Sequence, residues 1–354
     1  MLKRVNRIRK SVMKGLTKNV GRSRIDTKPG AHVTMRRILI SRPNHRLGNL
    51  LLITPLLQEI QNTFPNCKVD LFVKGGLAPI LFENYNNVDR IITLPKKPFK
   101  ELFKYMKVWV SLKRYRYDMV INLDKDSSSG RLSTQFVTAS SKIFGEHIEE
   151  LALKHDDYKH MAKNPVYKFR HFLTMLGFED KNLPVPLLDI KLTAEELAAG
   201  KKLLRELLPS GKKIISIFTY ATGDKCYDEN WWDNYYKKLQ KAFPDYTIIE
   251  VLPVENISKI GFKAPSFYSK DVREIAALIA NTSAFIGADS GIMHLAASSQ
   301  APVVGLFSVT NPEKYMPYGN GSIAIDTNSC TAEESFRKLN FILSYGQSSR
   351  LKYA

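Results

Sequence analysis

The sequence predicts an α/β protein with two doubly wound halves. Short apolar runs alternate with segments of helical pattern, which is typical of parallel sheets covered by helices. The alternation occurs twice, and a stretch with two prolines at 181–186 separates the two series. Several apolar runs end in turns of glycine and small polar residues, where such folds bind ligands. With 354 residues, the chain is long enough for two domains of ordinary size.

Composition limits the classes of function. A hydrophobic content of 44% and a charged content of 25% are those of a globular protein. The three cysteines (Cys67, Cys226 and Cys330) are far apart in the sequence, which argues against a disulfide framework or a structural zinc site. No apolar run reaches the roughly 20 residues that span a bilayer, and the N-terminus lacks the apolar core of a signal peptide. We therefore expect a cytoplasmic protein.

Residues 1–35 form a basic N-terminal extension. Apolar residues recur in it every three or four positions, at Leu2, Val5, Ile8, Val12, Leu16 and Val20, with lysines and arginines between them. This spacing predicts an amphipathic helix that lies on an anionic membrane surface through residues 1–30. A flexible or docked basic arm is the alternative. Although the formal net charge of +19 favours anionic partners in general, no aromatic residues interleave with these charges, so we expect no nucleic acid as partner. Residues 26–34 are interpreted as a linker.

The N-terminal half, 36–182, contains five predicted strands and five predicted helices. The strands are 37–41, 69–73, 90–94, 117–123 and 142–144. The helices are 50–64, 78–83, 99–114, 131–139 and 165–176, and residues 146–157 are expected to be irregular. Pro55 falls in the first turns of its helix, where a missing N–H costs little. The basic region around 96–114 could face membrane phosphates or a phosphorylated acceptor, or be an ordinary solvated surface.

The C-terminal half, 183–345, repeats the alternation. Thr193 and Glu196 form a capping-box pattern that starts a helix to residue 208. Strands are predicted at 213–218, 246–252, 265–268, 284–286, 302–307 and 322–325. Helices are predicted from about 231, at 271–280, at 292–299 and from Thr331 to about 345. Residues 346–354 are expected to be a frayed tail.

A turn in this half has the features of an anion site. Residues 287–291 (Gly-Ala-Asp-Ser-Gly) join a buried strand to a helix, and free N–H groups and the helix dipole at such a turn favour a phosphate. Asp289 and Ser290 can contact a ligand, and His294 lies one turn into the helix. The alternative is that they only cap the helix.

The surrounding segment resembles the ADP-heptose:lipopolysaccharide heptosyltransferase family, glycosyltransferase family 9. Four pieces carry the resemblance: DSGIMHLAA at 289–297, PVVGLF at 302–307, TNP at 310–312 and PYG at 317–319. The similarity extends over about 36–345. It implies the GT-B fold, two Rossmann-like domains facing across a cleft, with the nucleotide-sugar in the C-terminal domain and the acceptor in the N-terminal domain.

The same family begins with a pattern that LGNLLLITP at 47–55 resembles, with one departure. The family has an acidic residue, taken to be the general base, where this chain has Asn49. An amide cannot accept a proton at neutral pH. His45, with an ordinary pKa of about 6.5, could act as the base instead. Asp124 and Asp126 are the other candidates, and His45 could equally bind an anionic acceptor or have no role.

The resemblance also implies the donor-binding residues. Lys225 matches a lysine that is expected to pair with the diphosphate, with Thr222 and Gly223 beside it; the alternative is a surface lysine. Glu255 is placed near the ribose. Asp289, Ser290, Gly291 and His294 complete the predicted site. No metal or other cofactor is expected, since the donor is itself a substrate.

These inferences predict an inverting, metal-independent glycosyltransferase. It would transfer a heptose or related sugar from an ADP-sugar to a lipopolysaccharide core or another lipid-linked cell-envelope glycan, at the inner face of the cytoplasmic membrane. Three alternatives stay open. One is a transferase of the same fold with a different nucleotide-sugar donor. Another is a sugar-nucleotide-binding homologue without catalysis, because of Asn49. The third is a nucleic-acid-binding protein, which only the net charge supports.

Overall fold

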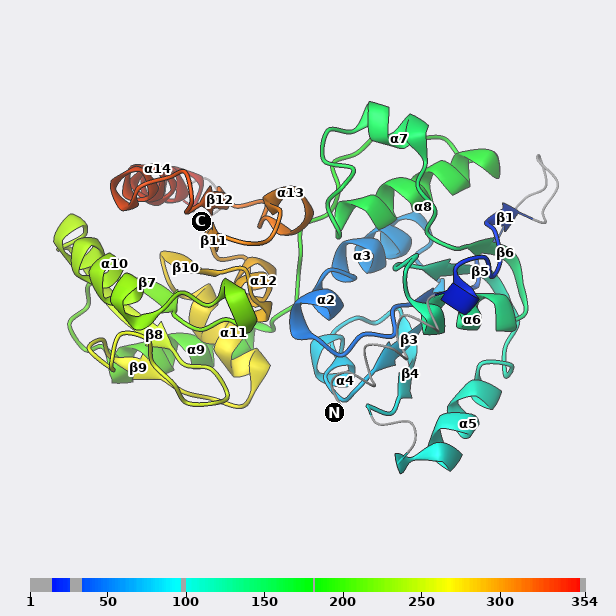
Figure 1. Ribbon diagram of the computed structural model, residues 1–354, viewed down its shortest axis with the longest axis horizontal. Coiled ribbons are helices and arrows are strands. Elements are labelled where there is room, and N and C mark those ends of the chain that lie inside the picture. Colours follow the sequence, from blue (N-terminus) through cyan, green and yellow to red (C-terminus); the bar gives the residue numbers. More distant parts are fainter. Residues whose placement is uncertain (1–14, 26–33, 97–99, 181, 351–354) are drawn as a thin grey trace. The chain divides into compact units, whose positions relative to one another are not determined.

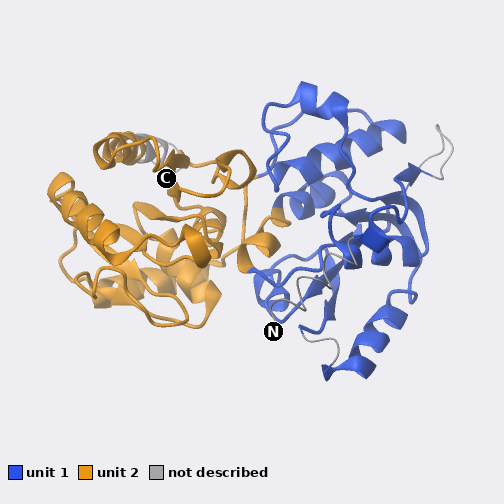
Figure 2. Cartoon of the chain, viewed as in Figure 1, with its two compact units in different colours: residues 1–46, 55–186 blue, residues 47–54, 187–354 orange. Residues whose placement is uncertain are grey.

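The chain forms two compact units. A computed structural model describes residues 15–25, 34–96, 100–180 and 182–350, with side chains up to residue 344. Unit 1 comprises Met1–Arg46 and Pro55–Pro186, and unit 2 comprises Leu47–Thr54 and Leu187–Ala354 (Figure 2). The short segment Leu47–Thr54 thus belongs by its contacts to the unit formed by the C-terminal half. Within the described ranges, no helix is both long and apolar enough to cross a bilayer.

Unit 1 contains a six-stranded sheet in the order β1-β6-β5-β2-β3-β4 (Figure 1). Five strands are parallel, and β1 (Arg24–Ile25) is an antiparallel edge strand. The parallel strands are β2 (Arg37–Ser41), β3 (Lys68–Lys74), β4 (Val88–Leu94), β5 (Tyr117–Asn122) and β6 (Ala139–Ile143). The helices are α3 (Thr54–Thr63), α4 (Ala78–Leu81), α5 (Leu102–Ser111), α6 (Ser128–Phe136), α7 (Glu149–Lys154) and α8 (Lys163–Met175). The strand order reverses between β2 and β5, and in this architecture ligands bind where it reverses, outside the carboxyl ends of the strands.

Unit 2 has a fully parallel sheet in the order β12-β11-β10-β7-β8-β9. Its strands are β7 (Lys213–Phe218), β8 (Tyr246–Val251), β9 (Ser266–Phe267), β10 (Ala284–Ala288), β11 (Val303–Phe307) and β12 (Ile323–Asp326). Its helices are α2 (Leu47–Leu51), α9 (Ala194–Leu207), α10 (Glu229–Ala242), α11 (Val272–Ala280), α12 (Gly291–Ser298), α13 (Pro312–Tyr315) and α14 (Ala332–Arg350), with a 3₁₀ turn η2 at Gly223–Lys225. The reversal point lies between β7 and β10.

The predicted capping box is confirmed. Thr193 Oγ1 accepts from the Glu196 N–H at 3.2 Å, and Glu196 Oε2 accepts from the Thr193 N–H at 2.7 Å. The buried Arg273 donates to both oxygens of Glu196, at 2.5 and 2.7 Å. The first turn of α9 is therefore tied to α11, and the capping side chain serves tertiary packing as well.

The predicted helix over 50–64 is wrong in its boundaries. The structure has two helices, α2 and α3, with a turn at 52–53 between them. Pro55 lacks the N–H that would bond to the carbonyl of Leu51, and the Thr54 hydroxyl donates to that carbonyl instead, at 2.7 Å. The break before Pro55 is what allows α2 to join unit 2 while α3 stays with unit 1.

Three further boundaries are corrected. The helix predicted at 131–139 begins earlier, at Ser128, because the Ser127 hydroxyl caps it by accepting from the Gly130 N–H. Residues 146–157, expected to be irregular, contain α7. The tail expected from 346 continues α14 to residue 350.

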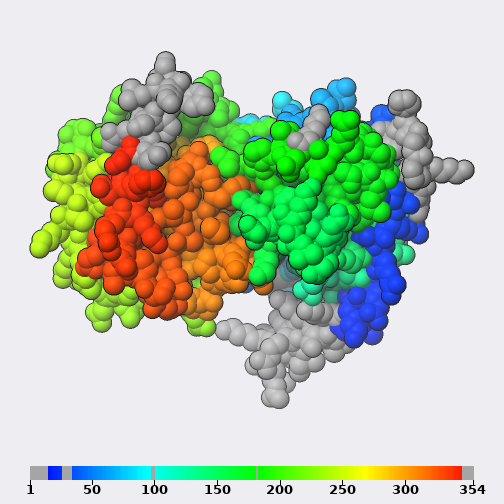
Figure 3. Space-filling model, turned by 90° about the horizontal axis from the view of Figure 1, so that it is seen from above, coloured from blue at the N-terminus to red at the C-terminus, as the bar shows by residue number. Residues whose placement is uncertain are grey.

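The described part of the N-terminal extension packs against unit 1. Arg131 donates to the carbonyls of Thr17, Val20 and Gly21 at 2.7–3.0 Å. Beyond this contact, β1 pairs with β6. Figure 3 shows the segment, in dark blue, along the edge of unit 1. The predicted membrane helix falls largely on residues 1–14, which lie outside the described residues.

Candidate active site

The best-connected group of predicted site residues lies in unit 2, where the strand order reverses. The loop after β7 carries Lys225, and the turn after β10 carries Asp289. Lys225 Nζ lies 3.1 Å from Asp289 Oδ2, and the Thr310 hydroxyl donates to the same oxygen at 2.7 Å. The other carboxylate oxygen lies 4.0 Å from Nε2 of the buried His294. The parallel pairing of β7 with β10 thus brings together residues 64 positions apart in sequence.

The turn after β10 is also a capped helix start. Ser290 is the N-cap of α12, and its hydroxyl accepts from the Met293 N–H at 3.3 Å. The capping interpretation of Ser290 is therefore confirmed, and it does not exclude ligand contact. Gly291 begins the helix, where backbone N–H groups have no acceptor within the helix and the dipole favours an anion. Lys225, across from this turn, adds a positive charge of the side-chain kind that phosphates bind.

Helix α2 packs against α12, so that two distant motifs meet. A methyl group on Gly48 would lie 2.6 Å from Cδ2 of His294 and 3.4 Å from the Gly291 Cα. A methyl group on Gly291 would lie 3.1 Å from the Leu47 Cβ and 3.3 Å from the Gly48 nitrogen. A side chain at Gly48 would require His294 to shift, and one at Gly291 would make an unusually tight contact. Asn49, partly buried, is the residue after Gly48 within α2.

A buried carboxylate supports the loop that leads to Lys225. Glu250, on β8, is fully buried, and it accepts hydrogen bonds from the hydroxyls of Thr219 at 2.5 Å and Ser258 at 2.6 Å. Thr219 in turn accepts from the Lys259 N–H at 3.1 Å. Burial raises the pKa of Glu250, and the hydrogen bonds from Ser258 and Thr219 oppose that rise. The network fixes the first residue of the loop after β7.

Three predicted donor residues lie in exposed loops of unit 2. Thr222 and Gly223 are exposed and lie three and two positions before Lys225, and Gly223 has a φ of +68°, which favours glycine. Glu255 is exposed in the loop after β8. Their assignment to the donor site stays a prediction.

The predicted acceptor-side residues lie in unit 1. His45 is exposed in the loop after β2, and Asp124 is half-buried in the loop after β5, the neighbouring strand. Asp124 Oδ1 accepts from the Asp126 N–H at 3.0 Å, which fixes this loop locally. Gly75 packs beside His45, since a methyl group on Gly75 would lie 3.0 Å from the His45 Cβ. Both candidate bases thus follow the strands at which the order in unit 1 reverses.

Sequence reasoning missed two contributors. Thr310 belongs to the TNP motif but was not assigned to the site; it shares the Asp289 carboxylate with Lys225. Glu250 could have been found, because an acid inside the apolar strand YTIIEV must have buried partners.

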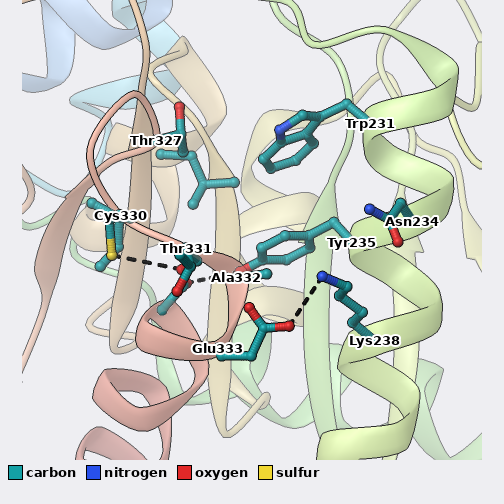
Figure 4. A pocket seen from close by; sticks show the side chains of 12 residues that line it. Trp231, Asn234, Tyr235, Lys238, Thr327, Cys330, Thr331, Ala332 and Glu333 are labelled. Atoms are coloured by element: carbon teal, nitrogen blue, oxygen red, sulfur yellow. Dashed lines mark hydrogen bonds and ion pairs between the residues drawn. The ribbon is translucent and has the colours of Figure 1, made fainter.

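The residues described in the structure offer no cluster of three or more His, Cys, Asp or Glu side chains that could hold a metal ion. A separate hollow of about 300 Å³ lies between α10 and the start of α14 (Figure 4). Tyr235 and Trp231 form one wall, and Lys238 lies 3.0 Å from Glu333 across it. No predicted site residue lines this hollow.

Comparison with known proteins supports the interpretation of the C-terminal motifs. Residues 270–343 match the model of glycosyltransferase family 9 (heptosyltransferase). The chain is 24% identical to lipopolysaccharide heptosyltransferase 3 of Escherichia coli, over 78% of this chain and 85% of that protein. It is also 24% identical to lipooligosaccharide heptosyltransferase 2 of Haemophilus influenzae, over 81% of this chain and 88% of that protein.

Solved structures show the same fold. A family 9 glycosyltransferase from Veillonella parvula matches with a TM-score of 0.68 at 16% identity, covering 89% of this chain and 99% of that one. E. coli heptosyltransferase WaaC, solved with ADP, matches with a TM-score of 0.61 at 18% identity, covering 86% of this chain and 99% of that one. The predicted fold class, with two Rossmann-like units as in GT-B enzymes, is confirmed.

Proposed function

The chain is a glycosyltransferase of the family 9 type, and from this premise we propose that it transfers a heptose or related sugar from an ADP-sugar to a lipopolysaccharide core or similar envelope glycan. One observation carries the assignment of the donor site. Gly48 of the N-terminal motif and Gly291 and His294 of the C-terminal motif meet at a contact that a single methyl group would disrupt. Two motifs more than 200 residues apart in sequence thus come into contact beside the Lys225–Asp289 pair.

Unit 2 is assigned to the donor. Lys225 and the N–H groups at the start of α12 would stabilise the diphosphate as it gains charge in the transition state. We propose that the diphosphate competes with Asp289 for Lys225, and that Thr310 keeps the Asp289 carboxylate in place. Thr222 and Gly223 would contact the phosphates beside Lys225, and Glu255 the ribose.

Unit 1 is assigned to the acceptor and the base. The acceptor hydroxyl oxygen attacks the anomeric carbon, the bond from that carbon to the diphosphate oxygen breaks with inversion, and ADP leaves. His45 takes the hydroxyl proton, since an imidazole can accept a proton at neutral pH and the amide of Asn49 cannot. Asp124 is the second candidate. The proposed reaction requires no metal, because the Lys225 ammonium and the N–H groups at the start of α12 would supply the positive charge beside the diphosphate.

Titration calorimetry tests this function. ADP-heptose, ADP, a GDP-sugar and a UDP-sugar are compared on the wild type, Lys225→Ala and Lys241→Ala, the last removing an exposed lysine at the end of α10. We expect ADP ligands to bind best. Lys225→Ala should weaken them about tenfold or more, because a hydrogen bond to a charged group contributes about 1.5–3 kcal/mol, and Lys241→Ala should not.

The outcomes separate the alternatives. Preference for another nucleotide keeps the fold and reaction class but changes the donor. ADP-heptose binding without release of ADP, when lipopolysaccharide lacking heptose is supplied, indicates the non-catalytic homologue favoured by Asn49. Equal binding by Lys225→Ala and the wild type contradicts the proposed phosphate site.

We also propose that the enzyme works at the inner face of the cytoplasmic membrane, with its basic N-terminus on the anionic surface. The test removes residues 1–14 only, because residues 15–25 hold β1 and the partners of Arg131. Vesicle binding should weaken in this deletion. Binding equal to that of the full chain contradicts the anchoring role.

A further inference from the structure

Helix α5 of unit 1 is apolar on two neighbouring sides, one packed against the core and one exposed. Its inner side carries Tyr105, Val108 and Trp109, which pack against the core cluster that contains Phe72 and Leu112. This side satisfies the need of the helix for a buried face. The exposed outer side also carries large apolar residues, which are Leu102 (55% exposed), Phe103 (92%), Met106 (59%) and Val110 (70%).

These four residues form a stripe. Phe103, Met106 and Val110 are spaced by three and four positions, which places them on one side of a helix, with Leu102 next to the first. Scattered exposed apolar residues are ordinary, as at Leu153 on α7. A row of four on one short helix is not, and such patches mark interaction surfaces. Figure 1 shows α5 at the periphery of unit 1.

Exposed cations surround the stripe. Basic residues precede the helix, lie along it and continue beyond it, at Lys100, Lys104, Lys107, Lys113 and Arg114. One acid is near, Glu101, which lies 3.3 Å from Lys104. Large apolar side chains ringed by lysines are the pattern of helices that lie in the interface of an anionic bilayer, with the apolar groups among the acyl chains and the lysines at the headgroups.

The position of the helix in the fold adds a second argument. A helix that connects two parallel strands runs back along the sheet, so its N-terminus lies near their carboxyl ends. Leu102 and Phe103 are therefore at the same edge of unit 1 as the loops of His45 and Asp124. Lys96, two residues after the end of β4, borders Gly75 together with His45.

We propose that α5 docks unit 1 on an anionic lipid bilayer by inserting Phe103, Met106 and Val110 below the headgroups. A second copy of the chain is a poorer occupant, because two such lysine-ringed stripes would repel each other in a chain of net charge +19. A lipid-borne acceptor would then reach the acceptor loops of unit 1 from the surface on which the enzyme lies. Only this last consequence rests on the proposed function, since bilayer docking is independent of which sugar is transferred.

Flotation of the full chain with vesicles tests the proposal. Vesicles of phosphatidylglycerol and phosphatidylcholine are compared with vesicles of phosphatidylcholine alone, for the wild type, the double variant Phe103→Ser/Met106→Ser, and Leu153→Ser. We expect the wild type to favour the anionic vesicles. The double variant should lose at least about tenfold in partitioning, because two large apolar side chains no longer leave water on binding, and the Leu153→Ser control should bind like the wild type.

A charge variant separates attraction from insertion. Lys107→Gln should lose about fivefold on anionic vesicles, as expected for one basic residue near the surface, and Lys201→Gln, on α9 of unit 2, should lose nothing. Phe103→Trp should shift its fluorescence to the blue when vesicles are added, because an inserted indole leaves water.

Several results would overturn the proposal. The first is that Phe103→Ser/Met106→Ser binds vesicles as well as the wild type, and the second is that the wild type does not bind vesicles. The third is that light scattering finds a dimer for the wild type and a monomer for the double variant. ADP affinity is measured on the same variants. If the double variant loses vesicle binding but keeps its ADP affinity, the docking surface is supported. If the wild type binds vesicles but does not prefer ADP ligands, only the donor assignment is refuted.

Discussion

The two sheets reverse their strand order in the same way, yet the edges at which they do so differ. In unit 2, Lys225, Asp289 and Thr310 form a connected and mostly buried group, and Glu250 supports the loop beside it. In unit 1, His45 is exposed and Asp124 is half-buried in its own loop. The difference teaches that one architecture can hold a connected polar group at the carboxyl ends of one sheet and more exposed side chains at those of the other, as the proposed binding of a small charged donor and a large glycan acceptor would require.

The largest expected effect is a loss of transfer rate, and it tests His45 in the loop after β2 of unit 1. His45→Gln should lower the transfer rate by about 10²-fold or more while leaving ADP affinity unchanged, because it removes the proposed base and not the proposed phosphate site. ADP release with lipopolysaccharide lacking heptose measures the rate, and calorimetry measures the affinity. Asp124→Asn is the matched variant on the neighbouring loop. If only Asp124→Asn loses activity, Asp124 is the base.

The next effect tests the glycine contact in unit 2. Gly48→Ala should push His294 away from its place and lower the transfer rate about tenfold or more, since overpacking of this kind costs about 1–3 kcal/mol. Gly76→Ala is the control, because a methyl group there meets nothing within 4 Å. Equal activity of the two variants would mean that the contact between the motifs has no part in the reaction.

A smaller effect compares two aspartates by stability. Asp289→Asn leaves Lys225 without its carboxylate partner in a largely buried setting, and we expect a loss of about 1–3 kcal/mol in the free energy of unfolding. Asp124→Asn should change it by at most about 0.5 kcal/mol, because its loop position is half-exposed. Urea unfolding at neutral pH measures both. A larger loss for Asp124→Asn would reverse the contrast between the two edges.

The smallest effect is a pH dependence. Burial raises the pKa of Glu250 in the folded state above its ordinary value of 4.5. Between these two pKa values the folded chain holds a proton that the unfolded chain has released, so the free energy of unfolding falls as pH rises through this window. Each unit of pKa difference corresponds to about 1.4 kcal/mol.

Unfolding curves from pH 4 to pH 8 would measure this dependence. Glu250→Gln should remove that part of the slope, whereas Glu255→Gln, exposed in the same unit, should keep it. If the free energy of unfolding of Glu250→Gln depends on pH as steeply as that of the wild type, the pH dependence comes from other groups.

Local patterns in the sequence determined most elements. Period and length indicated the parallel strands, and the capping pair Thr193 and Glu196 indicated the start of α9, because both signals depend on residues within a few positions. The same is true of the turn before α12, where the order of small and polar residues predicted an anion site. The predicted helix boundaries near Pro55 and Ser127 were wrong, because hydrogen bonds of the Thr54 and Ser127 hydroxyls determine where these helices begin.

Only the tertiary structure decided which distant residues meet. That Gly48 lies against His294, that Thr310 shares Asp289 with Lys225, and that Leu47–Thr54 joins the second unit follow from strand order and helix packing. The two sides of α5 make the same point. Its apolar positions are evident in the sequence, but only the packing of Trp109 against the sheet fixes Phe103 outward. Periodicity gives a helix its faces, and the neighbouring elements determine which face is covered.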